Sequence, residues 1–253
     1  MIHPTPSAKA PDRTSAKNRA NVKKDARGSR PKTQTPTNPR PSTRPAARAS
    51  TRSIGALREQ AAQCQACPLW KNATQTVFGE GRATARIVLI GEQPGDREDV
   101  TGKPFVGPAG QLLDRALQQA GVDRTATYVT NAVKHFKFEP RGKRRIHKKP
   151  NEQEISACHQ WLDQELHTIE PALIVAMGAT AARAVFGRAT AIGKNRGHVI
   201  SKPPLATEIA ADVLVTVHPS YLLRVPDEDR ATAFAQFVED LKLAQKYAPA
   251  NGG

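Results

Sequence analysis

Polar residues or glycine follow four short apolar runs of the sequence, and the polar types among them can support proton transfer and recognition of a polar ligand. The residues after these runs are Gly91-Glu92-Gln93-Pro94-Gly95-Asp96, then Asn131, then Gly178, and finally His218-Pro219-Ser220. Each signature alone is weak, because Asn after a strand often forms a turn and a lone His is often structural. In open α/β sheets, ligands bind beyond the carboxyl ends of the strands, so we expect these side chains to share one site.

Three cysteines form a second reactive set. Cys64 and Cys67 are separated by two residues, and Cys158 is distant in sequence. An odd count fits a reduced compartment, where cysteine is more often a metal ligand than half of a disulfide. Three sulfurs leave a four-coordinate metal site one ligand short.

A basic segment at 134–150 contains a further histidine, His147. Its cations suit contacts with a phosphate backbone, and on composition alone His147 is one more polar residue of a phosphate-binding loop. Positive neighbours also disfavour an imidazolium, which predicts a neutral ring at position 147. The cations concerned are Lys143, Arg144, Arg145, Lys148 and Lys149.

Together, in this order, the motifs resemble the uracil-DNA glycosylase superfamily. The Cys64-x-x-Cys67 pair and the Gly-Glu-Gln-Pro-Gly loop are similar to its iron–sulfur branch, related to family 4. Val133-Lys-His135-Phe-Lys-Phe with Lys143-Arg-Arg-Ile-His147 resembles the UdgX group, whose members bond covalently to uracil-containing DNA. The resemblance covers about residues 55–247, and the Lys-Arg-Arg-Ile-His segment is its most specific part.

The resemblance implies a pocket for a flat pyrimidine. Phe105 is expected to stack on the base, although a Phe in the core is the alternative; its Gly- and Pro-rich surroundings suit an exposed loop. The amide of Asn131 can pair with O4 and N3–H of uracil, whereas cytosine presents the opposite pattern. Because an unpaired buried polar group is costly, one amide can discriminate strongly. Backbone N–H groups near Gln93 are expected to hold another uracil oxygen.

Cleavage of an N-glycosidic bond builds positive charge on the sugar and negative charge on the base. By resemblance, His218 donates a hydrogen bond to uracil O2 as this charge develops. Glu92 is expected to stabilise the cation and handle a proton. Asp96 is the other candidate catalytic acid, since an ordinary glycosylase would use one of the two carboxylates to orient water, and it is expected to be the more structural of the pair.

The resemblance gives His147 the role of a nucleophile that captures C1′ before water does. This predicts one turnover per molecule, ending in a His147–DNA crosslink. Two alternatives remain: a multiple-turnover iron–sulfur uracil glycosylase that releases an abasic site, and a non-catalytic nucleic-acid-binding module.

His135 is the fourth metal ligand that the resemblance suggests, since iron–sulfur relatives have Cys in the corresponding segment. A [4Fe-4S] cluster with a structural role is expected, and zinc also suits a set of three Cys and one His. His159 and His167 are rival ligands that we interpret as solvated helix residues.

DNA contacts are expected from Lys143, Arg144, Arg145, Lys148, Ser220 and Arg224. The apolar residues between Ser220 and Arg224 can wedge into the gap left by a flipped nucleotide, or face the core as a Leu pair at a helix start. The expected partner is uracil-containing DNA, with single strands accepted, and the expected state is a monomer.

Strands and helices alternate along the chain, which predicts a three-layer α/β fold with a mostly parallel four-stranded sheet and helices on both faces. The expected strands are 86–90, 127–131, 172–177 and 213–217. The expected helices are 53–63, 108–120, 151–168 and 226–247, with a further helix beginning at Gly178 and a loop at 134–150.

Charge divides the chain in two. The net charge is +15, of which +11 lies in residues 1–52, where 13 Lys or Arg oppose Asp12 and Asp25. This segment also has 8 of the 20 prolines and no aromatic residue. We therefore expect a disordered basic tail, either solubilising or binding nucleic acid electrostatically, ahead of one domain at 53–253. The absence of a signal-like apolar segment predicts a cytoplasmic protein.

Overall fold

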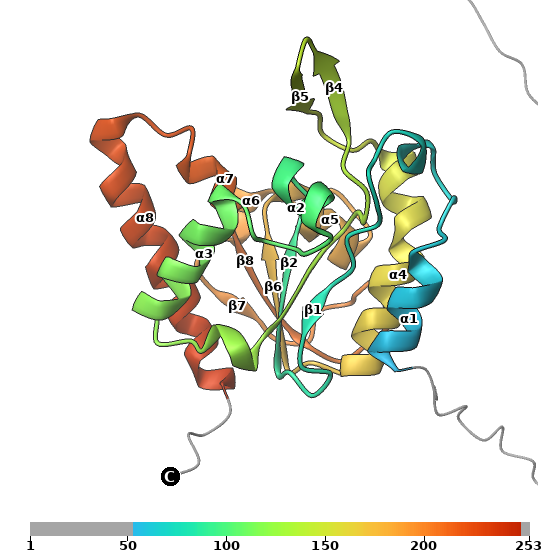
Figure 1. Ribbon diagram of the computed structural model, residues 1–253. Coiled ribbons are helices and arrows are strands. Elements are labelled where there is room, and N and C mark those ends of the chain that lie inside the picture. Colours follow the sequence, from blue (N-terminus) through green and yellow to red (C-terminus); the bar gives the residue numbers. More distant parts are fainter. Residues whose placement is uncertain (1–52, 249–253) are drawn as a thin grey trace, which may run out of the picture. The chain divides into compact units, whose positions relative to one another are not determined.

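The four predicted strands are present and form the parallel centre of one sheet in the computed structural model, which describes residues 53–248 (Figure 1). They are β2 (Ile87–Gly91), β3 (Tyr128–Asn131), β6 (Leu173–Met177) and β8 (Asp212–Thr216), in the order β3-β2-β6-β8. Nearly every strand residue is buried, because helices cover both faces, and this explains the unbroken apolar runs.

The sheet has six strands in the described chain rather than the four predicted. β1 (Glu80–Gly81) pairs antiparallel with β3, and β7 (Val199–Ile200) pairs antiparallel with β8. Both are edge strands of only two residues, too short to show a periodic pattern, so periodicity gave no signal for them.

Alternate strand residues point to opposite layers. One layer contains α1 (Ile54–Ala61), α4 (Glu152–Ile169) and α5 (Ala179–Phe186), and the other contains α3 (Pro108–Gln119), α7 (Pro219–Leu222) and α8 (Asp227–Lys242) (Figure 1). Short helical segments connect these elements: η1 (Pro68–Lys71), α2 (Asp96–Thr101), η2 (Arg124–Ala126), α6 (Ile192–Asn195) and η3 (Leu243–Tyr247).

Local sequence fixes where the helices begin. Ser53 caps α1 by accepting a hydrogen bond from the backbone of Ala56. Asn151 and Glu154 form a reciprocal capping box at the start of α4. These caps satisfy backbone N–H groups that the first helical turn leaves unpaired.

The segment predicted as a basic loop contains a β-hairpin, which corrects the prediction for 134–150. β4 (Phe138–Arg141) and β5 (Arg144–His147) pair antiparallel and project beyond the carboxyl-end edge of the main sheet (Figure 1). Gly142 lies in the two-residue turn with a φ of 58°, a conformation that glycine adopts without strain. The hairpin carries His147 on its last residue.

The predicted tail, residues 1–52, lies outside the described residues. Between residues 53 and 248, no helix combines the length and apolar character needed to cross a lipid bilayer.

Candidate active site

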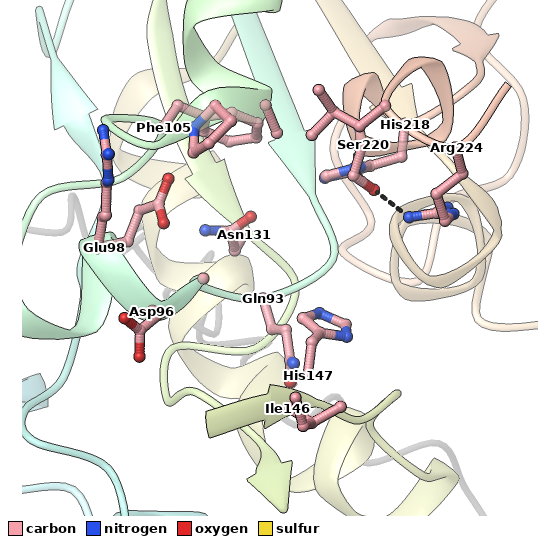
Figure 2. A pocket seen from close by; sticks show the side chains of 15 residues that line it. Gln93, Asp96, Glu98, Phe105, Asn131, Ile146, His147, His218, Ser220 and Arg224 are labelled. Atoms are coloured by element: carbon pink, nitrogen blue, oxygen red, sulfur yellow. Dashed lines mark hydrogen bonds between the residues drawn. The ribbon is translucent and has the colours of Figure 1, made fainter. Parts of the chain in front are cut away.

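A cavity of about 600 Å³ lies at the carboxyl ends of the parallel strands, where the sequence predicted a ligand site (Figure 2). A second cavity, of about 320 Å³, adjoins it and is lined by Glu92 together with His147 and His218. The predicted residues that line the larger cavity are Gln93, Asp96, Phe105, Asn131, His147, His218, Ser220 and Arg224.

Three of these side chains converge over Gly91, the last residue of β2. A Cβ atom at this position would lie 2.4 Å from Asn131 Oδ1, 2.6 Å from Phe105 Cζ and 3.2 Å from His218 Nε2. The glycine is therefore required by the close approach of its neighbours. Side chains from three separate segments meet there at one wall of the cavity.

The tautomer of His218 is fixed by the helix that follows it. The backbone N–H of Ser220 donates to His218 Nδ1 over 3.1 Å, so the proton of a neutral ring is on Nε2. Burial lowers the pKa of His218 to about 4, assisted by the nearby His147 and Arg224. Nε2 is buried and has no protein partner, which leaves a neutral N–H donor directed at the cavity.

Asn131 supplies the matching acceptor. Its side chain is buried and its Oδ1 has no protein partner. Its backbone oxygen accepts a hydrogen bond from Lys134 Nζ over 2.7 Å, and the same ammonium lies 2.6 Å from Glu165 Oε2. Because Lys134 and Glu165 are both buried, this ion pair anchors the end of β3 within the core.

Phe105 lines the cavity but is only 7% exposed, and it packs with the core beneath α3. This corrects the expectation of an exposed loop residue. Its ring centroid lies 6.1 Å from that of His218. Its φ of 57° lets Gly110 pack directly against its carbonyl, where any Cβ would collide. Loop and helix thus fix the ring at the cavity wall.

His147 faces Glu92 from the hairpin. Its Nε2 lies 3.6 Å from Glu92 Oε1, and its side chain is half exposed. Burial lowers its pKa most, Arg224 lowers it further, and Glu92 opposes the shift. The predicted direction is therefore confirmed, but the predicted cause was wrong, because the hairpin cations do not produce it. A neutral imidazole reaches the cavity that contains the donor and the acceptor.

The family model described as the uracil DNA glycosylase superfamily matches residues 78–242. The chain belongs to this superfamily. A Type-4 uracil-DNA glycosylase of Thermotoga maritima is 39% identical over 196 residues, covering 77% of this chain and 94% of the relative. A Type-4 uracil-DNA glycosylase of Pyrobaculum aerophilum is 35% identical over 174 residues, covering 67% and 84%. A Type-5 uracil-DNA glycosylase of the same organism is 31% identical, covering 56% and 64%.

In this uracil-DNA glycosylase superfamily member, the Gln93 side chain binds the hairpin stem. Its Nε2 donates to the carbonyl oxygens of Lys137 and Lys148, at 3.1 and 3.0 Å, and its Oε1 accepts from the backbone of Lys137. The sequence had pointed to backbone groups near Gln93 as ligands for a base oxygen. Apart from those backbone groups, the side chain fixes the loop after β2 to Lys148, the residue that follows His147.

Arg145 connects the hairpin to α2 through two carboxylates. Its guanidinium bonds Asp96 at 2.6 Å and Asp99 at 2.5 Å, and it lies over the rings of Phe136 and Phe138. The phosphate contact expected of Arg145 is thus replaced here by internal ion pairs. Asp96 is thus bound to Arg145 and also lines the larger cavity.

The other predicted DNA contacts lie on the surface around the cavity. Lys143 and Arg144 are exposed near the hairpin tip, and Lys148 pairs with Glu139. Arg224 donates to the Ser220 hydroxyl over 3.2 Å. The two leucines expected either to wedge into DNA or to face the core differ in exposure. Leu222 is buried in the core, whereas Leu223 is 47% exposed.

The cysteines lie close enough to influence one another electrostatically. Burial raises the pKa of Cys158 to about 12, and Cys67 and Cys64 contribute in the same direction. N–H groups of Lys134 and Trp161 donate to the sulfurs of Cys158 and Cys64, respectively. Three neighbouring sulfurs with N–H donors fit a thiolate-bound metal or cluster.

His135, the fourth metal ligand expected from the sequence, has a hydrogen-bond partner of its own. His135 Nε2 lies 2.9 Å from the hydroxyl of Thr76. Across residues 53–248, no three His, Cys, Asp or Glu side chains are arranged as a metal-binding group. The chemistry of the donors suits a cluster, but the side chains do not form a closed ligand set.

Sequence reasoning missed two polar residues beside the site. Asp99 is fully buried and accepts hydrogen bonds from Thr74 as well as Arg145. Thr180 is buried at the start of α5 and donates to Glu92 Oε2 over 2.5 Å. The signal for Thr180 was its position, two residues after Gly178 at the end of a central strand.

Proposed function

We propose that this chain excises uracil from DNA and then remains joined to C1′ of the abasic sugar through His147. The observation that supports the proposal is that a neutral His147 lines the same cavity as the unpaired Asn131 Oδ1 and His218 Nε2. A glycosylase acts on single-stranded DNA or on a nucleotide flipped from the duplex, so the base can enter such a cavity.

Two groups would read the base. The unpaired Oδ1 of Asn131 accepts from N3–H of uracil, and the amide N–H₂ of the same side chain donates to O4. The His218 Nε2–H group donates to O2, where negative charge accumulates as the base leaves. Cytosine has an acceptor at N3 and a donor at position 4, so it would leave the buried amide mismatched.

The bond-breaking step balances within this site. The C1′–N1 bond breaks and its electron pair leaves on uracil, while a lone pair of the His147 ring forms the new C1′–N bond. The alkylated ring then releases the proton from its other nitrogen, and Glu92 is the adjacent carboxylate that can accept it. The uracil anion takes up one proton. A neutral alkylated imidazole is a poor leaving group, so the adduct persists.

A denaturing gel with a uracil-containing single-stranded oligonucleotide tests the proposal, alongside an assay of free uracil. We expect one uracil released per protein molecule and a shifted band that survives heat and detergent. The H147S variant is expected to lose the shifted band and to admit water. An undiminished crosslink yield in H147S would exclude His147.

Multiple turnover is the second candidate function, because relatives 39% and 35% identical to the chain are named Type-4 uracil-DNA glycosylases. It predicts free uracil in molar excess over protein, with no shifted band. Salt-sensitive DNA binding without uracil release would instead indicate a non-catalytic module.

We also propose a [4Fe-4S] cluster held by Cys64, Cys67, Cys158 and His135. When bound, the cluster supplies a structural crosslink between the segments that carry these residues, and no catalytic step uses it. Iron and acid-labile sulfide measured on the purified protein test this assignment. About four of each per chain would support the cluster, whereas stoichiometric zinc without sulfide would replace it with a zinc site.

A further inference from the structure

Glu92 lines the smaller cavity beside His147, which lines both cavities, and the two oxygens of its carboxylate have different neighbours. Oε2 accepts a hydrogen bond from the Thr180 hydroxyl over 2.5 Å, and Oε1 lies 3.6 Å from His147 Nε2. The carboxylate therefore lies between a buried hydroxyl and a half-exposed imidazole.

The fold determines where the Thr180 hydroxyl lies. Strand β6 ends at Met177, and Gly178 turns the chain into α5 with a φ of 88°, a conformation that favours glycine. Thr180 is the second residue of α5 and is only 2% exposed. Its β-branched side chain has few allowed χ1 rotamers, which limits the positions that the hydroxyl can take beside Glu92.

We propose that Thr180 is a positioning residue for covalent capture, acting through Glu92. An unrestrained glutamate carboxylate rotates about its terminal bond. A hydrogen bond to one oxygen fixes this rotation and directs the other oxygen at the His147 ring, which must release a proton during attack. The inference rests on the proposed function, because it assigns Thr180 to the adduct-forming step.

A purely structural role for Thr180 makes different predictions. If the hydroxyl only stabilises the start of α5, its loss would lower the melting temperature and leave the chemistry per folded molecule unchanged. If it positions Glu92, its loss would slow the maximal rate of adduct formation and leave the DNA concentration at half-maximal rate unchanged.

The experiment measures single-turnover adduct formation against oligonucleotide concentration in wild type, T180V and T180S. T180V keeps the branched shape and removes the hydroxyl, whereas T180S keeps the hydroxyl. We expect a maximal rate about tenfold lower in T180V, the size typical of losing one hydrogen bond to a charged group. T180S is expected to stay within about threefold of wild type. T180A provides the same readout if T180V does not fold.

T207V is the matched control. Thr207 is also buried, at 1% exposure, but its hydroxyl has no hydrogen-bond partner. The same substitution there changes a buried threonine without touching Glu92, so we expect a wild-type rate of adduct formation.

An E92Q background tests whether Thr180 acts through the carboxylate. T180V should add little to E92Q, because the group that it positions has already changed. Equal rates in T180V and T207V, or a full additional tenfold loss in T180V/E92Q, would overturn the inference. Absence of any adduct in the wild type would instead overturn the proposed function, and Thr180 would lose its assigned step.

Discussion

The site has two halves that the protein builds in different ways. The sheet half contains Asn131 and His218, whose reactive atoms are buried and which converge over Gly91. The hairpin half contains His147, which is half exposed and lies on a two-stranded ribbon outside the main sheet. One half belongs to the core, and the other is attached to it by side chains.

Side-chain contacts hold the hairpin half in place. Gln93 binds its stem, and the partly exposed Arg145 pairs with the exposed Asp96 and the buried Asp99. In contrast, Asn131 is supported by the fully buried Lys134–Glu165 pair. The difference suggests that base recognition and covalent capture can be disrupted separately.

Gly91→Ala is expected to have the largest effect, because it damages the sheet half directly. The added Cβ would lie 2.4 Å from Asn131 Oδ1 and 2.6 Å from Phe105 Cζ, so the recognition groups must move. Displacement of such groups by about 1 Å lowers a catalytic rate by about 100-fold. Both uracil release and adduct formation should fall together in single-turnover assays.

Gly193→Ala is the control, because a Cβ there meets no atom within 4 Å. It should retain the wild-type rates. Loss of the adduct alone in Gly91→Ala, with normal uracil release, would contradict the division into two halves.

Lys134→Met is expected to have the next largest effect, and it should lower the stability of the fold rather than the rate of the reaction. It leaves Glu165 buried without its cation, a change that costs about 3–5 kcal/mol of unfolding free energy. Urea denaturation measures this cost. The double variant K134M/E165L removes both charges and should recover most of the loss; equal loss in single and double variants would argue against the ion pair as the cause.

The sheet half could largely be predicted from sequence. Its side chains follow apolar runs that form strands, and parallel strands bring their carboxyl ends to one edge, so Glu92, Asn131 and His218 were expected to meet. The helix starts at Ser53, Pro108 and Asn151 could also be predicted from the sequence, because capping and first-turn preferences depend on neighbouring residues in the chain.

The hairpin half could not be predicted in the same way. Its two strands, β4 and β5, contain charged residues and a proline. Among the described residues they pair only with each other, apart from the main sheet, so hydrophobic periodicity gives no signal for them. Only the two-residue turn at Gly142 and Lys143 was a local indication. The partners of Arg145 and Thr180 depend on tertiary packing, and their spacing in the sequence does not reveal them.

Arg145→Ala should separate the two halves. Removing the guanidinium breaks the ion pairs with Asp96 and Asp99, which frees the hairpin while the sheet half stays intact. We expect adduct formation to fall about tenfold, the size of losing charge-assisted hydrogen bonds, with uracil release less affected. Parallel gel and uracil assays measure both products.

Arg141→Ala removes an exposed cation from the same hairpin and serves as the control. It should keep the wild-type ratio of adduct to released uracil. An unchanged ratio in Arg145→Ala would show that the position of the hairpin does not depend on the ion pairs of Arg145 with Asp96 and Asp99.

The smallest expected effect is a displaced pH profile. His147 attacks only as a neutral ring, and its pKa lies below the ordinary value of 6.5. Adduct formation should therefore persist as pH falls below 6.5 and disappear only when the ring is protonated at lower pH. His218, with a pKa of about 4, stays neutral over most of this range. An acid limb at or above pH 6.5, measured by single-turnover rates, would contradict the lowered pKa of His147.

The central claim is that one histidine of the hairpin bonds to the sugar. Peptide mapping by mass spectrometry, after reaction with a uracil-containing oligonucleotide and nuclease digestion, tests it most directly. The account predicts that the abasic sugar is attached to the peptide containing His147 and that fragmentation localises it to that ring. Attachment at any other residue, or complete uracil release with no modified peptide, would contradict it.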